Sequence, residues 1–356
     1  MKLKKFSVVL GVVCTLTLAL TACGTAGSLG NSSGSNSSGG SSSNKSSGKF
    51  TIALSNSYIG NSWRTQMVNS FTQAAQQAKT QGEIANFEVV NADNTASQQI
   101  SQINDMILKG VSAIVIDSAS TTALNGVIAK AHAAGIPVIS FDSVVTSPDA
   151  YKVNYDYVGM GEDEAKYIVQ RLNGKGNVLI SRGVAGTSVD NGFYQGEMDV
   201  FKKYSGIRIV GQVYSNWTET TAQSAVASLL PSLPKVDAVA TEGGDGYGIA
   251  QAFSAAGKPE PIIIMGNRGD ELKWWAQQNK KDGYTTISES SSPTVGSASF
   301  WLALAVLQGA KVPQSVTMPT VKITQQDLSK WDTLGDSDVA GPSYDYSWVK
   351  QNLLTQ

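Results

Sequence analysis

Acidic side chains stand directly after short apolar runs in this chain, and they are the first candidates for a chemical role. Asp117 follows an Ala-Ile-Val-Ile run, Asp142 follows Pro-Val-Ile-Ser-Phe, and Glu242 follows Ala-Val-Ala after one threonine. Asparagine, arginine and aromatic residues occupy similar positions elsewhere. The candidate ligand-binding residues are Tyr58, Asn61, Trp63, Arg64, Asp117, Asp142, Asn191, Trp217, Glu242, Asn267, Arg268 and Glu289.

This combination of side chains suits a polyhydroxylated ligand such as a sugar. Carboxylates accept hydrogen bonds from vicinal hydroxyl groups, whereas Asn and Arg donate to ring and hydroxyl oxygens. The rings of Trp and Tyr offer flat apolar surfaces to the CH-rich faces of a pyranose or furanose. A few convergent polar groups in an aromatic cleft are the usual anatomy of a small-molecule site.

Several of these residues also have a purely structural interpretation. Acidic residues cap helices and initiate turns, so Asp117 and Asp142 can serve as cap or turn residues, although we favour the pocket for both. Trp63 fits the apolar face of a predicted helix as well as it fits a pocket. Arg64 is also compatible with a solvated helix position, whereas the polar loop around Trp217 favours a functional role over a packing role.

Apolar strands alternate with amphipathic helices from residue 49 onward. Apolar residues in segment 62–79 recur at helical spacing, and Gly110 and Gly135 stand where helices end. The predicted strands are 50–54, 87–90, 113–116, 137–141, 177–180, 207–213, 238–240, 261–265 and 284–287, and the predicted helices are 62–79, 95–109, 121–134, 161–172, 190–204, 218–230, 248–256, 271–279 and 294–307.

This alternation predicts an α/β fold of parallel sheets covered by helices. The pattern restarts near residue 161, so we predict two doubly wound, Rossmann-like lobes joined by a three-segment hinge. Open parallel sheets bind ligands beyond the carboxyl ends of their strands, where the candidate residues stand. The hinge is expected near 142–155, 289 and 312–321, with lobes formed by 49–152 plus 290–315 and by 153–289 plus 316–356.

The N-terminus carries the pattern of an export signal. Lys2, Lys4 and Lys5 precede an apolar run over 6–20 that is short for a membrane span. The following Leu-Thr-Ala-Cys sequence resembles the lipobox of bacterial lipoproteins, which implies cleavage of residues 1–22 and a lipid on Cys23. Residues 23–48 are almost entirely small and polar, so we predict a flexible tether that holds an extracytoplasmic domain at the cell membrane.

Composition and motifs disfavour several other functions. The formal net charge is −1 and basic runs are missing, which argues against a nucleic-acid partner. Cys14 and Cys23 are the only cysteines, so the mature domain has no thiolate metal site or disulfide, and we predict no cofactor or metal. His132 is the single histidine, and the common hydrolase and phosphate-loop motifs are missing. An enzyme remains the alternative of another class, through paired carboxylates acting on a glycoside.

Three stretches of the chain resemble the type I periplasmic sugar-binding proteins of ABC transporters. They are residues 110–116, residues 133–142, and Gly186-Thr187-Ser188 followed by Asn191 and Gly196. The resemblance covers about 49–321 and implies a two-lobed binding protein that delivers a monosaccharide to a membrane permease. It also implies a sugar-ligand role for Asp142 and matching positions for Tyr58, Asp117, Trp217, Glu242 and Glu289.

The resemblance leaves the sugar and the partner open. Ribose-type members usually have Arg at the position of Asn191 and often Asp in the stretch that here reads Asn267-Arg268. An acidic sugar or a furanose would use Arg64 and Arg268, and a neutral hexose is also compatible. We expect a monomer that serves an ABC permease, with a sensor that presents its ligand to a membrane receptor as the alternative.

Overall fold

The computed structural model describes residues 50–354. The predicted leader at 1–22, the tether at 23–48 and the lipidation site Cys23 lie outside the described residues. No helix of residues 50–354 combines the length and the apolar character that a bilayer-spanning segment needs.

A six-stranded sheet forms the centre of the N-terminal lobe. Its strands are β1 (Thr51–Asn56), β2 (Asn86–Asn91), β3 (Ala113–Asp117), β4 (Val138–Phe141), β5 (Ala150–Asn154) and β11 (Ser315–Thr317). Their order across the sheet is β11-β5-β4-β3-β1-β2, and every neighbouring pair is parallel. The carboxyl ends of β1, β3 and β4 therefore meet at one edge, as the sequence predicts.

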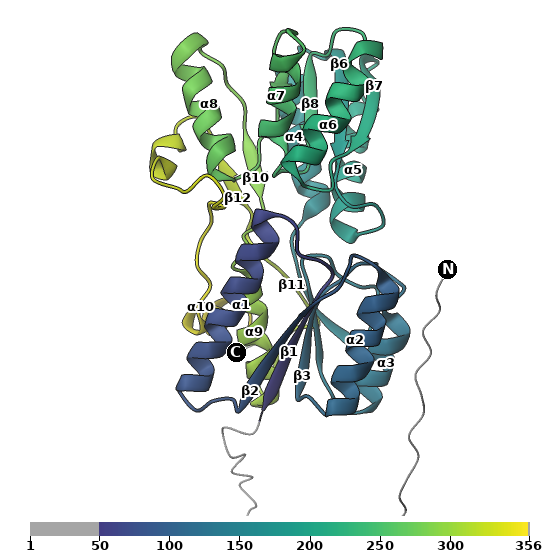
Figure 1. The fold of residues 1–356 in the computed structure, drawn as a ribbon, viewed down its shortest axis with the longest axis vertical. Helices are drawn as coiled ribbons and strands as arrows, with labels where there is room; N and C mark the ends of the chain where they lie inside the picture. The colour runs from purple at the N-terminus through teal and green to yellow at the C-terminus, as the bar shows by residue number, and fades with distance from the viewer. Residues whose placement is uncertain (1–49, 355–356) are drawn as a thin grey trace, which may run out of the picture. The chain divides into compact units, whose positions relative to one another are not determined.

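Helices cover both faces of this sheet (Figure 1). The helices α1 (Ser62–Thr80) and α9 (Val295–Leu307) pack against each other on one face, where the ring of Phe71 meets the ring of Phe300 at a centroid distance of 5.4 Å. The other face carries α2 (Ala96–Lys109) and α3 (Asn125–Ala133) over a separate apolar cluster. Burial on both faces explains why the central strands are almost wholly apolar.

The C-terminal lobe repeats this architecture with a four-stranded parallel sheet. The strands stand in the order β7 (Gly206–Tyr214), β6 (Lys175–Arg182), β8 (Ala238–Thr241) and β9 (Ile262–Ile263). Two apolar clusters again cover the two faces. The helices of this lobe are α4 (Tyr157–Arg171), α5 (Ser188–Phe201), α6 (Glu219–Leu229), α7 (Gly246–Ala255) and α8 (Gly269–Asp282). Helix α6 continues into the short 3₁₀ helix η1 (Leu230–Ser232).

The chain passes between the lobes in the three predicted regions. It does so after β5, after β10 (Ser288–Ser290) and after β11, which leads into β12 (Val321–Ile323). The strands β10 and β12 form a two-stranded antiparallel sheet. The segment predicted as a strand at 284–287 is not one; the strand lies at 288–290, where pairing with β12 stabilises it.

The C-terminal tail departs from the predicted lobe boundary. In the 3₁₀ helix η2 (Leu328–Trp331), Leu328 packs with Trp275 of the C-terminal lobe. Beyond it, α10 (Tyr346–Asn352) packs on α9 of the N-terminal lobe, with the ring of Tyr346 stacked on Trp301 at 5.0 Å. The prediction that all of 316–356 belongs to the C-terminal lobe is therefore wrong, because the apolar residues of α10 are buried against α9. This return is a fourth passage between the lobes.

Two buried glutamates lie where α4 and α5 pack closely together. A side chain at Gly161 would lie 2.2 Å from the carbonyl oxygen of Phe193, so this approach requires glycine. Glu164 and Glu197 are fully buried, and among the described residues neither carboxylate oxygen of Glu164 has a hydrogen-bond partner. Burial raises the pKa of Glu197 to about 8, with Arg182 opposing the shift, and raises the pKa of Glu164 well above its ordinary value.

Replacing Glu197 with Gln is expected to stabilise the protein at alkaline pH. The folded state holds the Glu197 proton up to about pH 8, whereas the unfolded chain releases it near its ordinary pKa of 4.5. The stability of the wild type therefore falls as the pH rises from 4.5 towards 8, and Glu197→Gln removes that slope. We expect a melting temperature about 5 °C above wild type at pH 8.5 and a smaller difference at pH 5. Glu162→Gln, at a half-buried position of α4, is the control, and equal slopes in all three proteins would contradict the prediction.

Candidate functional site

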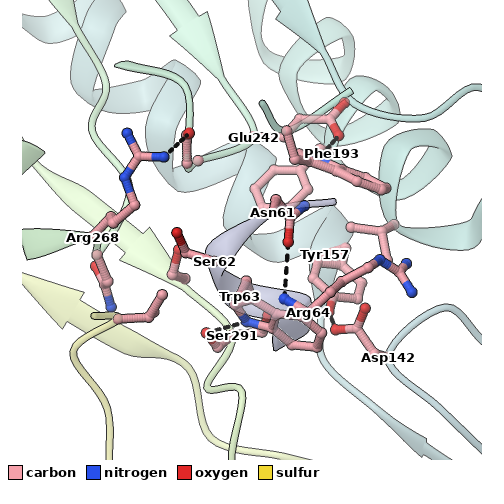
Figure 2. Close-up of a pocket in the computed structure, with 17 residues that line it drawn as sticks. Asn61, Ser62, Trp63, Arg64, Asp142, Tyr157, Phe193, Glu242, Arg268 and Ser291 are labelled. Carbon is pink, nitrogen blue, oxygen red and sulfur yellow. Dashed lines mark hydrogen bonds between the residues drawn. The ribbon is translucent and has the colours of Figure 1, made fainter. Parts of the chain in front are cut away.

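A cavity lies between the two lobes and receives residues from both (Figure 2). It holds about 660 Å³ of empty space, a figure that includes space open to solvent. Its walls combine aromatic rings with hydrogen-bonding groups. The lining residues are Asn61, Ser62, Trp63, Arg64, Asp142, Tyr157, Val189, Phe193, Trp217, Glu242, Gly243, Gly244, Asn267, Arg268, Ser290, Ser291 and Val339.

Arg64 forms the centre of the N-terminal side. Asn61 caps α1 by accepting a hydrogen bond from the Arg64 backbone N–H at 2.9 Å, which fixes the first turn of the helix. The guanidinium of Arg64 donates to Asp117 Oδ2 at 2.6 Å and to Asn56 Oδ1 at 2.7 Å, and both members of the ion pair are buried. Burial opposes the charge of Arg64, but Asp117 raises its pKa above the ordinary value. The ion pair therefore presents a neutralised cation to the cavity.

Asp142 lies beside this ion pair at the end of β4. Its backbone is left-handed, with a φ of 54°, and its N–H donates to the carbonyl of Val153 at 3.0 Å. The hydroxyl of Tyr157, at the start of α4, donates to Asp142 Oδ1. Burial raises the pKa of Asp142, while the Tyr157 hydrogen bond and the charge of Arg64 oppose the shift. The result is a desolvated, oriented hydrogen-bonding group at the cavity wall.

Glu242 and Trp217 form the opposite wall. The indole Nε1 of Trp217 donates to Glu242 Oε2 at 2.9 Å, and Oε1 of Glu242 has no hydrogen-bond partner within the described part of the chain. Burial raises the pKa of Glu242 well above its usual range, with repulsion from Asp190 adding to the shift. A buried oxygen without a partner is costly, and a ligand hydroxyl at this position would satisfy it.

The position of the Trp217 ring depends on a glycine. Trp217 has a φ of 53°, and a Cβ atom added at Gly183 would lie only 2.0 Å from its ring. The ring thus packs directly on the backbone that follows β6. Glycine at position 183 is required here by the close approach rather than by the backbone conformation.

The Gly183→Ala substitution is expected to weaken ligand binding without unfolding the protein. The new methyl group would displace the Trp217 indole and lengthen its hydrogen bond to Glu242, so one wall of the cavity would lose its shape. We expect the dissociation constant to rise about tenfold, as calorimetric titration would measure. Gly126→Ala, in helix α3 with open space around the added Cβ, is the matched control. Wild-type affinity in Gly183→Ala would contradict this role.

Arg268 completes the cavity at the start of α8, and its charge is also balanced. Its guanidinium pairs with Glu219 at 2.5 Å and with Asp270 at 2.6 Å. It also donates to the carbonyl of Gly244 at 3.2 Å. Arg268 and Asp142 lie at opposite ends of the cavity in the view of Figure 2.

Eight of the twelve predicted site residues line this cavity: Asn61, Trp63, Arg64, Asp142, Trp217, Glu242, Asn267 and Arg268. Asn267 holds the fold as well, since its amide donates to the carbonyl of Val321 at 3.1 Å and its oxygen accepts from Ser288. Trp63 donates to the carbonyl of Ser291 at 3.2 Å.

Four predicted residues do not line the cavity. Asp117 lies behind Arg64, and the ring of Tyr58 contacts the Arg64 guanidinium at 4.3 Å. Asn191 is exposed because the buried stripe of α5 runs through 189, 190, 193, 196 and 197. Glu289 accepts from Thr320 at 2.6 Å; it points away because its strand neighbour Ser290 faces the cavity and successive strand residues alternate.

Several residues of the cavity were not predicted from the amino-acid sequence. Tyr157 and Phe193 contribute aromatic surface from the first turn of α4 and the second turn of α5, and Ser291 and Val339 come from connecting segments. Tyr157 would have been a candidate site residue if the helix had been predicted to begin at residue 157 rather than at residue 161. Val339 carries no local signal, because only the tertiary fold brings the C-terminal tail to the cavity. No group of three or more His, Cys or acidic residues within 50–354 is arranged to hold a metal ion.

The fold and the interlobe cavity define a two-lobed α/β protein of the class that binds small solutes. A crystal structure of an ABC transporter solute binding protein from Thermobispora bispora DSM 43833 superimposes with a TM-score of 0.81 at 37% sequence identity, covering 85% of this chain and 94% of that one. The sequence profile of the periplasmic binding protein domain matches residues 52–311. The chain therefore belongs to the periplasmic binding protein domain family.

Several curated proteins are similar to this chain in sequence, and the length of the matching region differs among them. The xylitol-binding protein of Mycolicibacterium smegmatis is 30% identical over 203 residues, a match that spans 56% of this chain and 58% of that protein. The ribose import binding protein of Bacillus subtilis is 26% identical over 280 residues, covering 78% of this chain and 88% of the relative. The D-xylose-binding periplasmic protein of Escherichia coli is 32% identical over 192 residues, covering 51% and 57% of the two chains.

Proposed function

We propose that this protein is the solute-binding component of an ABC importer, and that it binds an uncharged monosaccharide or sugar alcohol in the interlobe cavity for delivery to a membrane permease. The observation that carries the proposal is the charge balance of the cavity. Its two cationic side chains, Arg64 and Arg268, are each paired with carboxylates of the protein itself. Asp142 and Glu242 add acceptors but no positive charge.

This balance favours hydroxyl groups over a ligand carboxylate. Burial raises the pKa values of Asp142 and Glu242, so the site disfavours negative charge; the carboxylate of an acidic sugar would meet the same penalty, and neither arginine has an unpaired charge to compensate it. Hydroxyl groups, in contrast, can donate to the carboxylate oxygens and accept from Arg64. The expectation that an acidic sugar would use Arg64 and Arg268 is therefore disfavoured, and neutral sugars remain.

The aromatic residues of the cavity favour a cyclic or open-chain polyol as the ligand. Trp63, Tyr157, Phe193 and Trp217 surround the cavity, and Figure 2 shows the labelled rings facing the space between Asp142 and Glu242. Such rings bury the CH surface of a sugar while the carboxylates bind its hydroxyl groups. The curated relatives are named for xylitol, ribose and D-xylose, all of them uncharged polyhydroxy compounds.

A calorimetric titration with neutral and acidic sugars tests this proposal. We expect at least one pentose, hexose or sugar alcohol to bind, and the corresponding uronic or aldonic acid to bind at least 100-fold more weakly. A bound ligand at 100 times its dissociation constant raises the stability by about 2.7 kcal/mol, so a thermal-shift screen can select the candidates first. Tighter binding of the acid, or recovery of a chemically altered sugar, would overturn the proposal.

We also infer that the mature chain is monomeric and attached to the outer face of the cell membrane through lipid on Cys23. The family is extracytoplasmic, and the sequence before Cys23 supports the lipid. Metabolic labelling with an alkyne fatty acid should label the wild type and leave Cys23→Ser unlabelled. Labelling of both proteins would refute the assignment of Cys23.

A further inference from the structure

The tail segment 335–341, which we call the strap, lies at one edge of the cavity between the two lobes. It follows η2 and precedes the return of the chain to the N-terminal lobe. One of its side chains, Val339, lines the cavity together with Trp63 and Arg268. The strap is outside the matched profile region 52–311.

The strap is hydrogen-bonded to the C-terminal lobe along one edge. The N–H of Gly269 donates to the carbonyl of Asp338 at 2.8 Å, and the N–H of Ala340 donates to the carbonyl of Asn267 at 2.8 Å. A Cβ atom at Gly269 would lie 2.0 Å from the carbonyl oxygen of Gly335, so the two segments approach as closely as glycine allows. Through these contacts Val339 forms an isolated antiparallel bridge with Arg268, next to the start of α8.

The other edge of the strap is bound by one side chain of the N-terminal lobe. Gln66 Nε2 donates to the carbonyl of Ser337 at 2.9 Å, and Gln66 Oε1 accepts from the N–H of Val339 at 3.1 Å. In an extended segment the carbonyl of one residue and the N–H two residues later point to the same side. The Gln66 amide therefore pairs with the strap as a neighbouring strand would, while Asp338 pairs on the opposite side.

We propose that Gln66 is a positioning residue that holds the strap between the lobes, and that Val339 determines which ligands fit the cavity. The ligand in this inference is the one of the proposed function. The hydrogen bonds between Gln66 and the strap do not depend on that function. Gln66 lies one helical turn after Trp63 on α1, so the same turn supplies a cavity wall and the anchor of the strap. Val339 is consequently fixed relative to Trp63, and its side chain limits the ligand at that edge.

The Val339→Ala substitution tests the role in specificity. Removing two methyl groups enlarges the cavity at one edge, and one methylene in a pocket changes discrimination by about 10- to 200-fold. We expect the affinity ratio of a hexose to the pentose of matching configuration to rise at least tenfold in Val339→Ala. An unchanged ratio would overturn the assignment. Val316→Ala, on the partly buried edge strand β11 away from the cavity, is the matched control.

Substitutions of Gln66 test the positioning role. Gln66→Ala removes both hydrogen bonds, and we expect the dissociation constant to rise about tenfold. Gln66→Glu keeps the acceptor but loses the donor to Ser337 when it is ionised, so its affinity should approach wild type only at a pH low enough to protonate the new carboxyl group. Gln76→Ala, on the exposed side of α1, is the control. Wild-type affinity in Gln66→Ala, or a pH profile of Gln66→Glu equal to that of Gln66→Ala, would overturn the inference.

A measurement without ligand separates this inference from the proposed function. In hydrogen exchange followed by NMR, the amide of Val339 should exchange at least tenfold faster in Gln66→Ala than in the wild type, while amides in the core of α8 remain unchanged. Equal exchange at Val339 would overturn the positioning role even if sugars bind. Faster exchange in a protein that binds no sugar would support the strap and refute the proposed function alone.

Discussion

Replacing Asp142 with Ala is expected to abolish sugar binding, with a dissociation constant raised by at least about 100-fold. Loss of a buried, hydrogen-bonded acidic group at a binding site typically costs 2–5 kcal/mol. The substitution also leaves the hydroxyl of Tyr157 without its acceptor and removes a neighbour of Arg64. Calorimetric titration with the sugar that the wild type binds is the measurement.

The control for this prediction separates chemistry from backbone strain. Asp142 has a left-handed backbone, which Ala tolerates less well than Asn. Asp142→Asn should therefore fold like the wild type and keep an acceptor for Tyr157, yet bind at least tenfold more weakly because the acidic group is gone. Asp332→Ala, which removes an exposed acid from the tail, should change nothing. Undiminished affinity in Asp142→Asn and Asp142→Ala would show that Asp142 is not a ligand.

The Arg64→Met substitution should have the largest effect on stability. Removing one member of a buried ion pair typically costs about 3–5 kcal/mol, because the remaining charge has no partner. Asp117 would be that charge: burial already raises its pKa to about 7 against the attraction of Arg64. We expect a melting temperature lower by about 10 °C and a severe loss of sugar affinity. Differential scanning calorimetry measures the first effect.

The pH dependence and a double variant make this prediction specific. Without Arg64 the folded-state pKa of Asp117 would rise above its wild-type value of about 7, so the deficit relative to wild type should grow as the pH increases above about 7. Arg64→Met combined with Asp117→Asn removes both charges and should recover at least half of the lost stability. A deficit that is independent of pH, with no recovery in the double variant, would contradict a buried ion pair.

The sequence alone determined the elements and much of the binding edge. Hydrophobic periodicity located the central strands and most helices, and Gly110 ends α2 with the left-handed conformation that its residue type predicts. Asp142 and Glu242 could each be placed at the binding edge of its own lobe without a structure, because the carboxyl ends of parallel strands meet at one edge of each sheet. These inferences depend on local periodicity and on the geometry of parallel sheets, and both can be read from residue types.

The tertiary structure decided which side chains reach the cavity. Asn191 and Phe193 are two residues apart on one helix, but only Phe193 lies on the stripe that packs inward. Glu289 and Ser290 are adjacent, yet the pairing of β10 with β12 turns Ser290 to the cavity and Glu289 away from it. Val339 lines the cavity and donates its N–H to Gln66, 273 residues away in the sequence. Orientation and long-range pairing depend on packing between distant segments, which no local pattern records.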